Sequence, residues 1–296
     1  MHIGIVDLMA TTARGLAQNQ FARLVESSLP RGAEHVEIST VDLDPQADWL
    51  GSPGSPRDWD LITSFDAVIV TGAEPQTAEL KVDPSFALVG RILDATASRA
   101  VSVLFSCLSA HAALGHIYGL SRRRLGEKCV GVLPHTVAPS SGEITAGLPQ
   151  HVTMPHSRWN TVRRTELAEA GVRLALLAGT GDWAIATSPD GFRYTFVQGH
   201  PEYFSDTLWR EYRRDVKRFL YGESDDYPSL PSNYFAAAHV EAFDAFCRYA
   251  QNNRRAGTFA AFPEAPPALE DARAWAYAAR VLTANWTRNV LETLNA

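Results

Sequence analysis

Short apolar runs alternate with segments of helical periodicity through the first two fifths of the chain, and this alternation constrains the fold most strongly. In one such segment, Leu16, Phe21, Leu24 and Val25 share one side of a helix. Strands that alternate with helices form βαβ units, whose parallel strands are buried on both faces. The expected strands are Ile3–Val6, Val36–Leu43, Ala67–Thr71 and Val101–Ser106, and the expected helices are Thr11–Ser28 and Ser85–Ser98. The sequence therefore predicts an α/β fold with a mostly parallel sheet flanked by helices.

The pattern changes in the second half of the chain. From Lys128 to Val197 short strand-like runs are joined by tight turns, and helical segments follow. The expected strands there are Val172–Leu177, Trp183–Thr187 and Arg193–Val197, and the expected helices are Ser205–Leu220, Ala236–Asn252 and Leu269–Leu294. Gly51–Pro56 is expected to be a surface loop. We expect a single domain over residues 1–296, with an α/β core to about residue 222 and a C-terminal helical extension over about 223–296 packed on it.

Composition and charge restrict the partners of the chain. Hydrophobic residues make up 46% and charged residues 20%, and the net charge is −6 without a block of like charges. We therefore expect a globular protein that binds neither nucleic acid nor an anionic membrane. The run Arg122–Arg124 is the local exception, and it fits a solvated loop better than a contact to the phosphates of an anionic cofactor. No apolar stretch is long enough to cross a bilayer, and His2–Asp7 is typical of a first strand rather than of a signal peptide.

The cysteines indicate a reducing compartment. Cys107, Cys129 and Cys247 are odd in number and far apart, which argues against a disulfide framework. No pair of cysteines or histidines has the spacing of metal ligands. We therefore expect a cytoplasmic protein without a metal site.

Cys107 stands at a predicted junction between a strand and a helix. It follows the apolar strand Val101–Ser106 and precedes the helical segment Leu108–Tyr118, among small residues that permit a sharp turn. Such a turn places a side chain at the carboxyl edge of the sheet, where open α/β sheets bind ligands. The helix N-terminus favours the thiolate, which is the nucleophilic form. By position alone a buried structural cysteine is the slightly better interpretation.

The segment Gln198–Glu202 supplies the groups that would activate this thiol. It follows a predicted strand, and in an extended or turning segment Glu202 can hold the imidazole of His200 because residues two apart face the same way. A carboxylate that orients a histidine, which in turn activates a nucleophile, is the logic of a catalytic triad. Together the two motifs favour a cysteine-nucleophile enzyme.

These motifs resemble the class I glutamine amidotransferases and, more closely, the homoserine O-acyltransferase family of the methionine pathway, which shares their fold. The resemblance runs almost from end to end. Its segments are Thr71-Gly72-Ala73, Tyr118-Gly119-Leu120, Glu127-Lys128, Gly131-Val132, Pro155-His156-Ser157-Arg158, Gly199-His200-Pro201-Glu202-Tyr203, Glu211–Val216, Asn233-Tyr234-Phe235 and Asn285-Trp286.

The resemblance implies a role for each matching residue. Cys107 would be the nucleophile, His200 the base and Glu202 the residue that orients it. Backbone amides of Gly72, Ala73 and Leu108 would form the oxyanion hole. The amino-acid substrate would be bound by Lys128, Ser157, Arg158 and Arg214, with Pro155–Arg158 as a substrate-binding turn.

The same resemblance implies a reaction and its substrates. An acyl group would pass from acyl-CoA to Cys107 and then to the side-chain hydroxyl of L-homoserine, in a ping-pong mechanism without a bound cofactor. The partners would be a small amino acid and acyl-CoA. The resemblance also allows a homodimer. In this family the residue five beyond the threonine of the Thr-Gly-Ala loop tends to decide the donor. That residue is Gln76, whose bulk predicts acetyl-CoA over succinyl-CoA.

Three alternatives remain at this point. Leu108 replaces the bulky aromatic residue that commonly follows the nucleophile, so the pocket edge differs and L-serine is an alternative acceptor. A glutamine amidotransferase-like hydrolase is the second, although Phe105–His111 lacks the glycines and glutamine typical around its nucleophile. The third is a non-catalytic relative that binds a metabolite.

Overall fold

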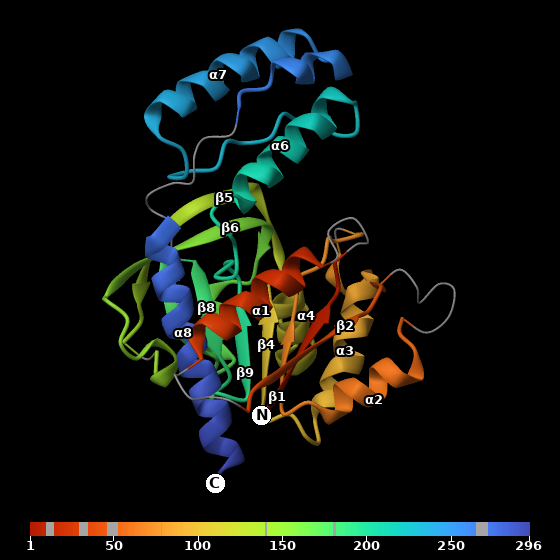
Figure 1. Cartoon of the computed structure of the whole chain (residues 1–296), viewed down its shortest axis with the longest axis vertical. Helices are drawn as coiled ribbons and strands as arrows, with labels where there is room; N and C mark the ends of the chain where they lie inside the picture. Colours follow the sequence, from red (N-terminus) through yellow and green to blue (C-terminus); the bar gives the residue numbers. More distant parts are fainter. Residues whose placement is uncertain are drawn as a thin grey trace.

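The computed structural model describes residues 1–9, 15–29, 35–45, 53–77, 79–139, 141–179, 182–264 and 272–296. Within these ranges nine strands form one sheet in the order β2-β1-β3-β4-β9-β8-β7-β5-β6. They are β1 (His2–Asp7), β2 (Glu37–Asp42), β3 (Ala67–Val70), β4 (Ser102–Ser106), β5 (Arg123–Val137), β6 (His151–Thr161), β7 (Arg173–Ala178), β8 (Trp183–Thr187) and β9 (Tyr194–Val197). Helices flank the sheet, which confirms the expected α/β fold (Figure 1).

The first half of the sheet is parallel and covered on both faces. Strands β2, β1, β3, β4 and β9 pair in parallel. Side chains alternate along them between two apolar clusters, because successive residues of a strand face opposite sides. The helices are α1 (Leu16–Ser28), α2 (Pro56–Ser64), α3 (Pro84–Thr96) and α4 (Leu108–Tyr118). Val68 and Val70 pack in the cluster with α2, α3 and α4, whereas Ala67 and Ile69 pack in the cluster with α1 and the C-terminal helix α8 (Ala272–Leu294).

The second half of the sheet is antiparallel. β9 pairs antiparallel with β8, and the pairing continues through β7 and β5 to β6. Pro155–Arg158 does not form the expected turn but lies within β6. β6 is the edge strand of the sheet, where a proline is tolerated because one side of the strand has no ladder to complete. The short helix α5 (Arg164–Glu169) and the 3-10 turns η2 (Leu80–Val82) and η3 (Glu143–Thr145) complete the connections.

The expected loop Gly51–Pro56 ends in helix α2, which begins at Pro56 and has a capping box between Ser55 and Asp58. The expected helix Thr11–Ser28 is described from Leu16, and its first residues lie outside the described ranges.

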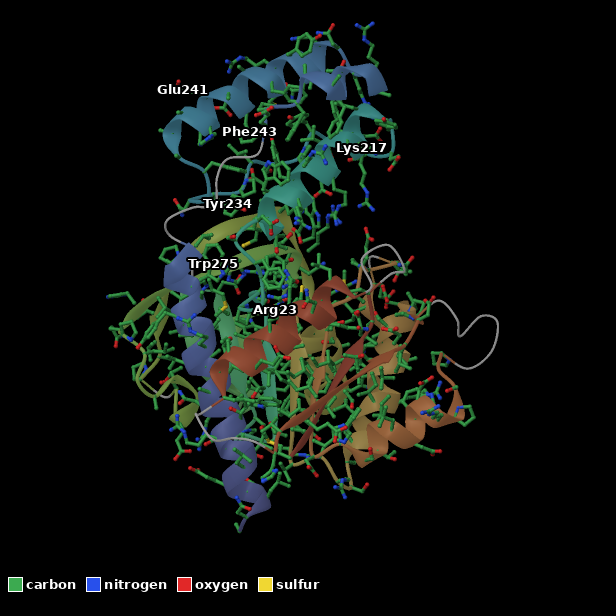
Figure 2. The ribbon with its side chains drawn as sticks, in the orientation of Figure 1. Arg23, Lys217, Tyr234, Glu241, Phe243 and Trp275 are labelled. Carbon is green, nitrogen blue, oxygen red and sulfur yellow. The ribbon has the colours of Figure 1, made fainter. Side chains whose placement is uncertain are left out.

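The residues after β9 form a second layer and then return to the sheet. Helix α6 (Thr207–Leu220) and helix α7 (Ala237–Asn252) lie above the sheet in Figure 1, with the 3-10 turn η4 (Ala256–Ala261) beside them. Phe243 lies between α7 and α6 in Figure 2, in an apolar cluster with Tyr212 and Val216. Helix α8 runs back along the sheet, and the indole of Trp286 donates a hydrogen bond of 2.8 Å to the Ser102 hydroxyl of β4. Of the helices described, none combines the length and the apolar character needed to cross a membrane.

Gly131 in β5 permits a close approach between the sheet and the segment after α6. Its φ of +136° is one that side chains rarely adopt, and a Cβ there would lie 2.3 Å from the Ser232 carbonyl oxygen. Ser232 donates its N–H to Val130 and accepts from Val132, so this approach is fixed by two backbone hydrogen bonds.

We expect Gly131→Ala to lower the free energy of unfolding by about 2 kcal/mol or more, because a backbone clash and a strained φ act together. Gly126→Ala in the same strand is the matched control, since nothing lies within 4 Å of a Cβ built there. Denaturant unfolding followed by circular dichroism measures both variants. Equal stability of the two would contradict the close packing of Ser232 on β5.

Candidate active site

Cys107 occupies a strained turn between β4 and α4. Its backbone has φ 52° and ψ −110°, one of two positive φ values found at non-glycine residues within the described ranges. Such a conformation costs roughly 1–3 kcal/mol and persists only where neighbouring structure imposes it. The restraint is a backbone hydrogen bond of 2.7 Å from Cys107 N–H to the Val197 carbonyl, at the end of the adjacent strand β9. The partly exposed thiol thus stands at the carboxyl edge of the parallel strands and at the N-terminus of α4.

The same strand pairing brings His200 to the thiol. β9 ends at Val197, and His200 follows three residues later, with its N–H bonded to the Pro155 carbonyl at 2.8 Å. Its Nδ1 lies 2.8 Å from Oε1 of Glu202. Within the described residues, no nitrogen or oxygen atom forms a hydrogen bond with His200 Nε2. The Cys107 side chain nevertheless interacts with the ring. The structure therefore brings together the three residues predicted to form the triad.

The electrostatics of His200 suit a base that passes through a charged state. Burial acts to lower the pKa of His200, but the Glu202 carboxylate and the Cys107 side chain outweigh it and hold that pKa well above its usual value. The ring also stacks on Tyr203, with centroids 4.3 Å apart. Because Glu202 accepts from Nδ1, the free Nε2 is the atom that can exchange a proton with sulfur.

The loop after β3 lies beside the nucleophile. A Cβ on Gly72 would lie 3.4 Å from the Cβ of Cys107, so the absence of a side chain leaves room next to the sulfur. The hydroxyl oxygen of Thr71 lies 3.1 Å from the buried Asp7 carboxylate and accepts from Leu8 N–H, which ties this loop to the end of β1. Leu108 is the first residue of α4, and the first N–H groups of a helix have no partner inside it. Gly72 thus lies beside Cys107 and Leu108 follows it in the chain, and the role of Gly72, Ala73 and Leu108 as an oxyanion hole stays a prediction.

Lys128 and Arg214, both predicted to bind substrate, meet at one carboxylate. The Asp215 side chain of α6 accepts from Lys128 Nζ at 3.0 Å and from Arg214 Nε at 2.9 Å. Burial acts to raise the pKa of Asp215, but the two cations outweigh it and lower that pKa. The Arg214 side chain remains 48% exposed, so the pair presents positive charge to solvent beside the β5–β6 hairpin.

Ser157 of β6 is hydrogen-bonded to Glu211 of α6, a residue that was not predicted to bind substrate. Its hydroxyl donates to Glu211 Oε2 at 2.5 Å, and the Tyr203 hydroxyl donates to Oε1 at 2.6 Å. Glu211 lies on the same side of α6 as Asp215, one helical turn away. Both acids lie in the segment Glu211–Val216, which was already matched to the family, and this is the signal in the sequence that could have pointed to them.

Arg158 does not face this group. Its side chain is 5% exposed, and it donates to the Asp182 carboxylate, to the Asn160 carbonyl at 2.9 Å and to Nδ1 of His156 at 3.2 Å. His156 in turn contacts His135, with Nε2 atoms 3.0 Å apart. Burial lowers the pKa of His135 to about 4, so the pair stays neutral. The arrangement favours a supporting role for Arg158 beneath the catalytic loop.

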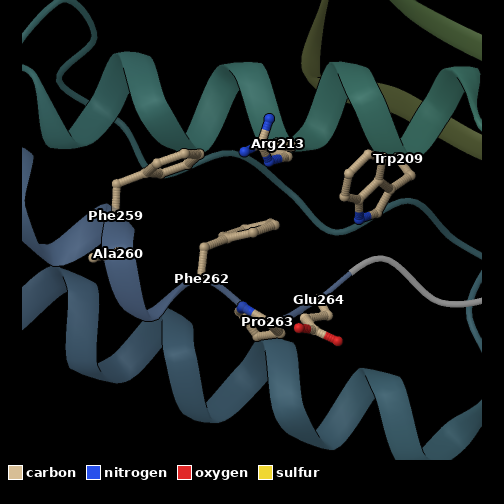
Figure 3. Close-up of a pocket in the computed structure, with 7 residues that line it drawn as sticks. All are labelled: Trp209, Arg213, Phe259, Ala260, Phe262, Pro263 and Glu264. Atoms are coloured by element: carbon tan, nitrogen blue, oxygen red, sulfur yellow. The ribbon is translucent and has the colours of Figure 1, made fainter.

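A hollow on another side of α6 is distinct from this site. Figure 3 shows it between α6 and the segment from η4 to Glu264. Its volume is about 610 Å³. Arg213 lies over the Phe259 ring at 5.0 Å and over the Trp209 ring at 5.6 Å. Because Trp209 and Arg213 stand two positions from Glu211 and Asp215, they project from a different side of the helix. Among the described residues, no group of three or more histidine, cysteine, aspartate or glutamate side chains could hold a metal ion.

The charge on His200 gives a testable pH dependence. Its folded pKa lies above the ordinary value of 6.5, so its contribution to stability is fully present below about pH 6.5 and is lost as the pH rises through the folded pKa. Glu202→Gln removes the carboxylate and leaves burial, so we expect the pKa of His200 to fall below 6.5 and this alkaline loss of stability to disappear. NMR titration of the imidazole measures the pKa, with the exposed-surface variant Glu223→Gln as control. An unchanged pKa in Glu202→Gln would contradict the pairing.

Comparisons with known proteins identify the family of the chain. A family model described as homoserine O-succinyltransferase matches residues 1–294. Among curated proteins, the homoserine O-succinyltransferases of Methylorubrum extorquens and Cardiobacterium hominis are each 34% identical over 97% of this chain, covering 86% and 81% of their own lengths.

Solved structures support the fold alone. A glutamine amidotransferase from Methylobacillus flagellatus matches with a TM-score of 0.56 at 15% identity, covering 97% of this chain and 94% of its own. One from Thermotoga maritima matches with a TM-score of 0.54 at 13% identity, covering 98% of both chains. The fold is thus that of class I glutamine amidotransferases, and by its sequence the chain belongs to the homoserine O-succinyltransferase family.

Proposed function

We propose that this chain transfers an acyl group from acyl-CoA to the hydroxyl of L-homoserine through a thioester on Cys107. The observation that carries the proposal is the position of Cys107, strained at the edge of the sheet, beside the bonded pair His200 and Glu202. Membership in the homoserine O-succinyltransferase family supports the same reaction class.

The first half-reaction needs a thiolate and a place for negative charge. His200 Nε2 takes the proton of Cys107, and the sulfur attacks the carbonyl carbon of acyl-CoA. The oxyanion is stabilised by backbone N–H groups of Gly72, Ala73 and Leu108. The C–S bond to CoA then breaks, and the imidazolium returns its proton to the departing CoA thiolate. Glu202 stabilises the imidazolium throughout, in keeping with the raised pKa of His200.

The second half-reaction uses the same groups on a different nucleophile. His200 takes the proton of the homoserine hydroxyl, whose oxygen attacks the thioester carbon. The bond to Cys107 breaks, the O-acyl ester leaves, and the proton on His200 returns to the cysteine sulfur.

The paired charges on α6 suit a zwitterion. Arg214 and Lys128 present cationic donors, which bind an α-carboxylate well because charge-assisted hydrogen bonds are strong. Glu211 supplies a carboxylate for the α-ammonium group, with its oxygens already oriented by Ser157 and Tyr203. A carboxylate and two cations on one helix and the strand beside it would orient the acceptor hydroxyl toward Cys107.

Succinyl-CoA is the donor we propose, against the acetyl preference expected from Gln76. That preference assumed that Gln76 fills the space for a longer acyl chain. In the structure Gln76 is exposed, and its side-chain amide donates to the Glu74 carbonyl of its own loop at 3.1 Å. The relatives are named for succinyl transfer. Both observations favour succinyl over acetyl.

The thioester is tested directly by mass spectrometry. Without acceptor, wild type mixed with succinyl-CoA should gain one succinyl mass on a peptide containing Cys107, whereas Cys107→Ala should gain none and remain folded. Cys129→Ala is the control and should still be acylated. An adduct on Cys129 or Cys247 would refute the nucleophile, and no adduct together with glutamine hydrolysis would favour an amidotransferase. Binding of acyl-CoA without adduct or CoA release would favour a non-catalytic relative.

The acceptor contacts are tested by steady-state and single-turnover kinetics. Arg214→Ala should raise the KM for L-homoserine by about 10- to 100-fold, because a charge-assisted pair to the carboxylate is lost. Acylation of Cys107 should stay nearly unchanged, since the first half-reaction does not involve the amino acid. Arg213→Ala, the neighbour on another side of α6, should leave both quantities unchanged. If acylation falls as sharply as turnover in Arg214→Ala, the assignment is wrong, and comparison with L-serine shows which acceptor is preferred.

A further inference from the structure

The segment that carries His200 is closed as a tight turn. The turn spans His200-Pro201-Glu202-Tyr203, and the Tyr203 N–H donates to the His200 carbonyl at 3.3 Å. Proline is favoured at the second position of such a turn because its φ is already set at about −65°. The first and fourth residues of a β-turn lie close together. The turn therefore brings the Tyr203 ring to the His200 imidazole, and the two stack with centroids 4.3 Å apart and planes inclined by 20°.

The Tyr203 side chain is itself held by the sheet and by α8. It packs against an apolar cluster that includes Val130 and Val132 of β5 and Trp275 of α8. The Trp275 indole also donates to the Tyr203 carbonyl at 3.1 Å, which holds the backbone of the turn. Because its surroundings restrain the Tyr203 ring, this ring can in turn restrain the imidazole stacked on it.

The stack supplies a restraint on His200 that its hydrogen bonds do not. The Glu202 carboxylate lies 2.8 Å from Nδ1 and so holds one point of the imidazole ring. Nε2, the atom that exchanges a proton with the Cys107 sulfur, forms no hydrogen bond to nitrogen or oxygen within the described residues. A ring held at one nitrogen can still tilt about that contact. The flat face of Tyr203 limits this tilt, because tilting would break the stack.

The hydroxyl of Tyr203 bonds to Glu211 of α6. It donates to Glu211 Oε1 at 2.6 Å, and the Ser157 hydroxyl donates to Oε2. Burial and the Glu211 carboxylate raise the pKa of Tyr203 well above its ordinary value, so the hydroxyl keeps its proton and remains a donor. One donor on each oxygen fixes the plane of the carboxylate and leaves further lone pairs for an incoming cation.

We propose that Tyr203 is a positioning residue for both the base and the acceptor site. Its ring fixes the plane of His200, and its hydroxyl orients the Glu211 carboxylate that receives the α-ammonium group of the amino acid. The proposal rests on the proposed acyl transfer through Cys107 and assigns separate roles to two parts of one side chain. The ring acts in both half-reactions, because His200 takes a proton in each. The hydroxyl acts in the second alone, since the amino acid enters only there.

The experiment separates the two parts of the side chain. Tyr203→Phe keeps the ring and removes the hydroxyl, whereas Tyr203→Leu removes both, with Tyr203→Met as a second ringless variant should the first not fold. Tyr212→Phe is the matched control, because it removes a hydroxyl of α6 that contacts Tyr227 instead of Glu211. Single-turnover mass spectrometry measures acylation of Cys107 by succinyl-CoA without acceptor. Steady-state kinetics gives the KM for L-homoserine, and thermal unfolding shows that each variant is folded.

The expected results differ between the two substitutions. Tyr203→Phe should acylate Cys107 within about twofold of the wild-type rate and raise the KM for L-homoserine by about three- to tenfold, because one hydrogen bond to the Glu211 carboxylate is lost. Tyr203→Leu should slow acylation at saturating succinyl-CoA by about 10- to 100-fold, since a misaligned base transfers its proton poorly. The KM for succinyl-CoA should stay unchanged in both, and Tyr212→Phe should match wild type throughout.

Other outcomes would overturn the proposal. Equal losses of acylation in Tyr203→Phe and the ringless variants would show that the stack does not position the base. Normal acylation in a ringless variant would exclude the role of the ring, and an unchanged KM in Tyr203→Phe would exclude that of the hydroxyl. Unfolding of both ringless variants while Tyr203→Phe keeps the wild-type KM would mean that Tyr203 only supports the fold. Failure of wild type to be acylated by succinyl-CoA or acetyl-CoA would instead refute the proposed function itself.

Discussion

The parallel pairing of β4 with β9 is the interaction on which the site depends. Ser106 stands opposite Val197 in this ladder, so the next residue, Cys107, donates its N–H to the Val197 carbonyl. The bond that continues the ladder also holds the strained turn, and it fixes where β9 ends and the loop to His200 begins. Two segments far apart in the sequence are thereby placed at the same edge of the sheet. A shift of register between these strands would separate the Cys107 thiol from the His200 imidazole.

The strand–helix alternation and the proximity of Cys107, His200 and Glu202 could be predicted because each depends on local pattern. Buried parallel strands such as β3 are short apolar runs in the sequence. A side chain at a junction from strand to helix lies at the carboxyl edge of the sheet. The β5–β6 hairpin was not predicted as such, because most of the first five residues of β5 are exposed and the strand lacks strict alternation of buried and exposed residues. Pro155 led to the prediction of a turn where β6 lies. Proline is rare in central strands, but an edge strand tolerates it. The division near residue 222 remains a prediction.

Contacts between charged side chains were the least predictable part of the site. The sequence placed Lys128, Ser157 and Arg214 near one substrate, but it gave no sign that Asp215 and Glu211 would each hold two of the surrounding groups. Nor did it show that Arg158 turns inward to Asp182 instead of outward. Such choices depend on which carboxylate tertiary structure brings within reach, because a buried arginine requires a partner whereas an exposed one does not.

Helix α6 relates the added C-terminal layer to the chemistry. Tyr212 and Val216 bury one side of α6 against α7, and Glu211 and Asp215 project from another side toward β5 and β6. Trp275 of α8 donates to the Tyr203 carbonyl at 3.1 Å, and the Tyr203 ring packs on His200. Residues after α6 therefore support both helix α6 and the loop that carries His200. Because the glutamine amidotransferases with a similar fold are only 13–15% identical to this chain, the shared fold alone does not determine which substrate this chain binds.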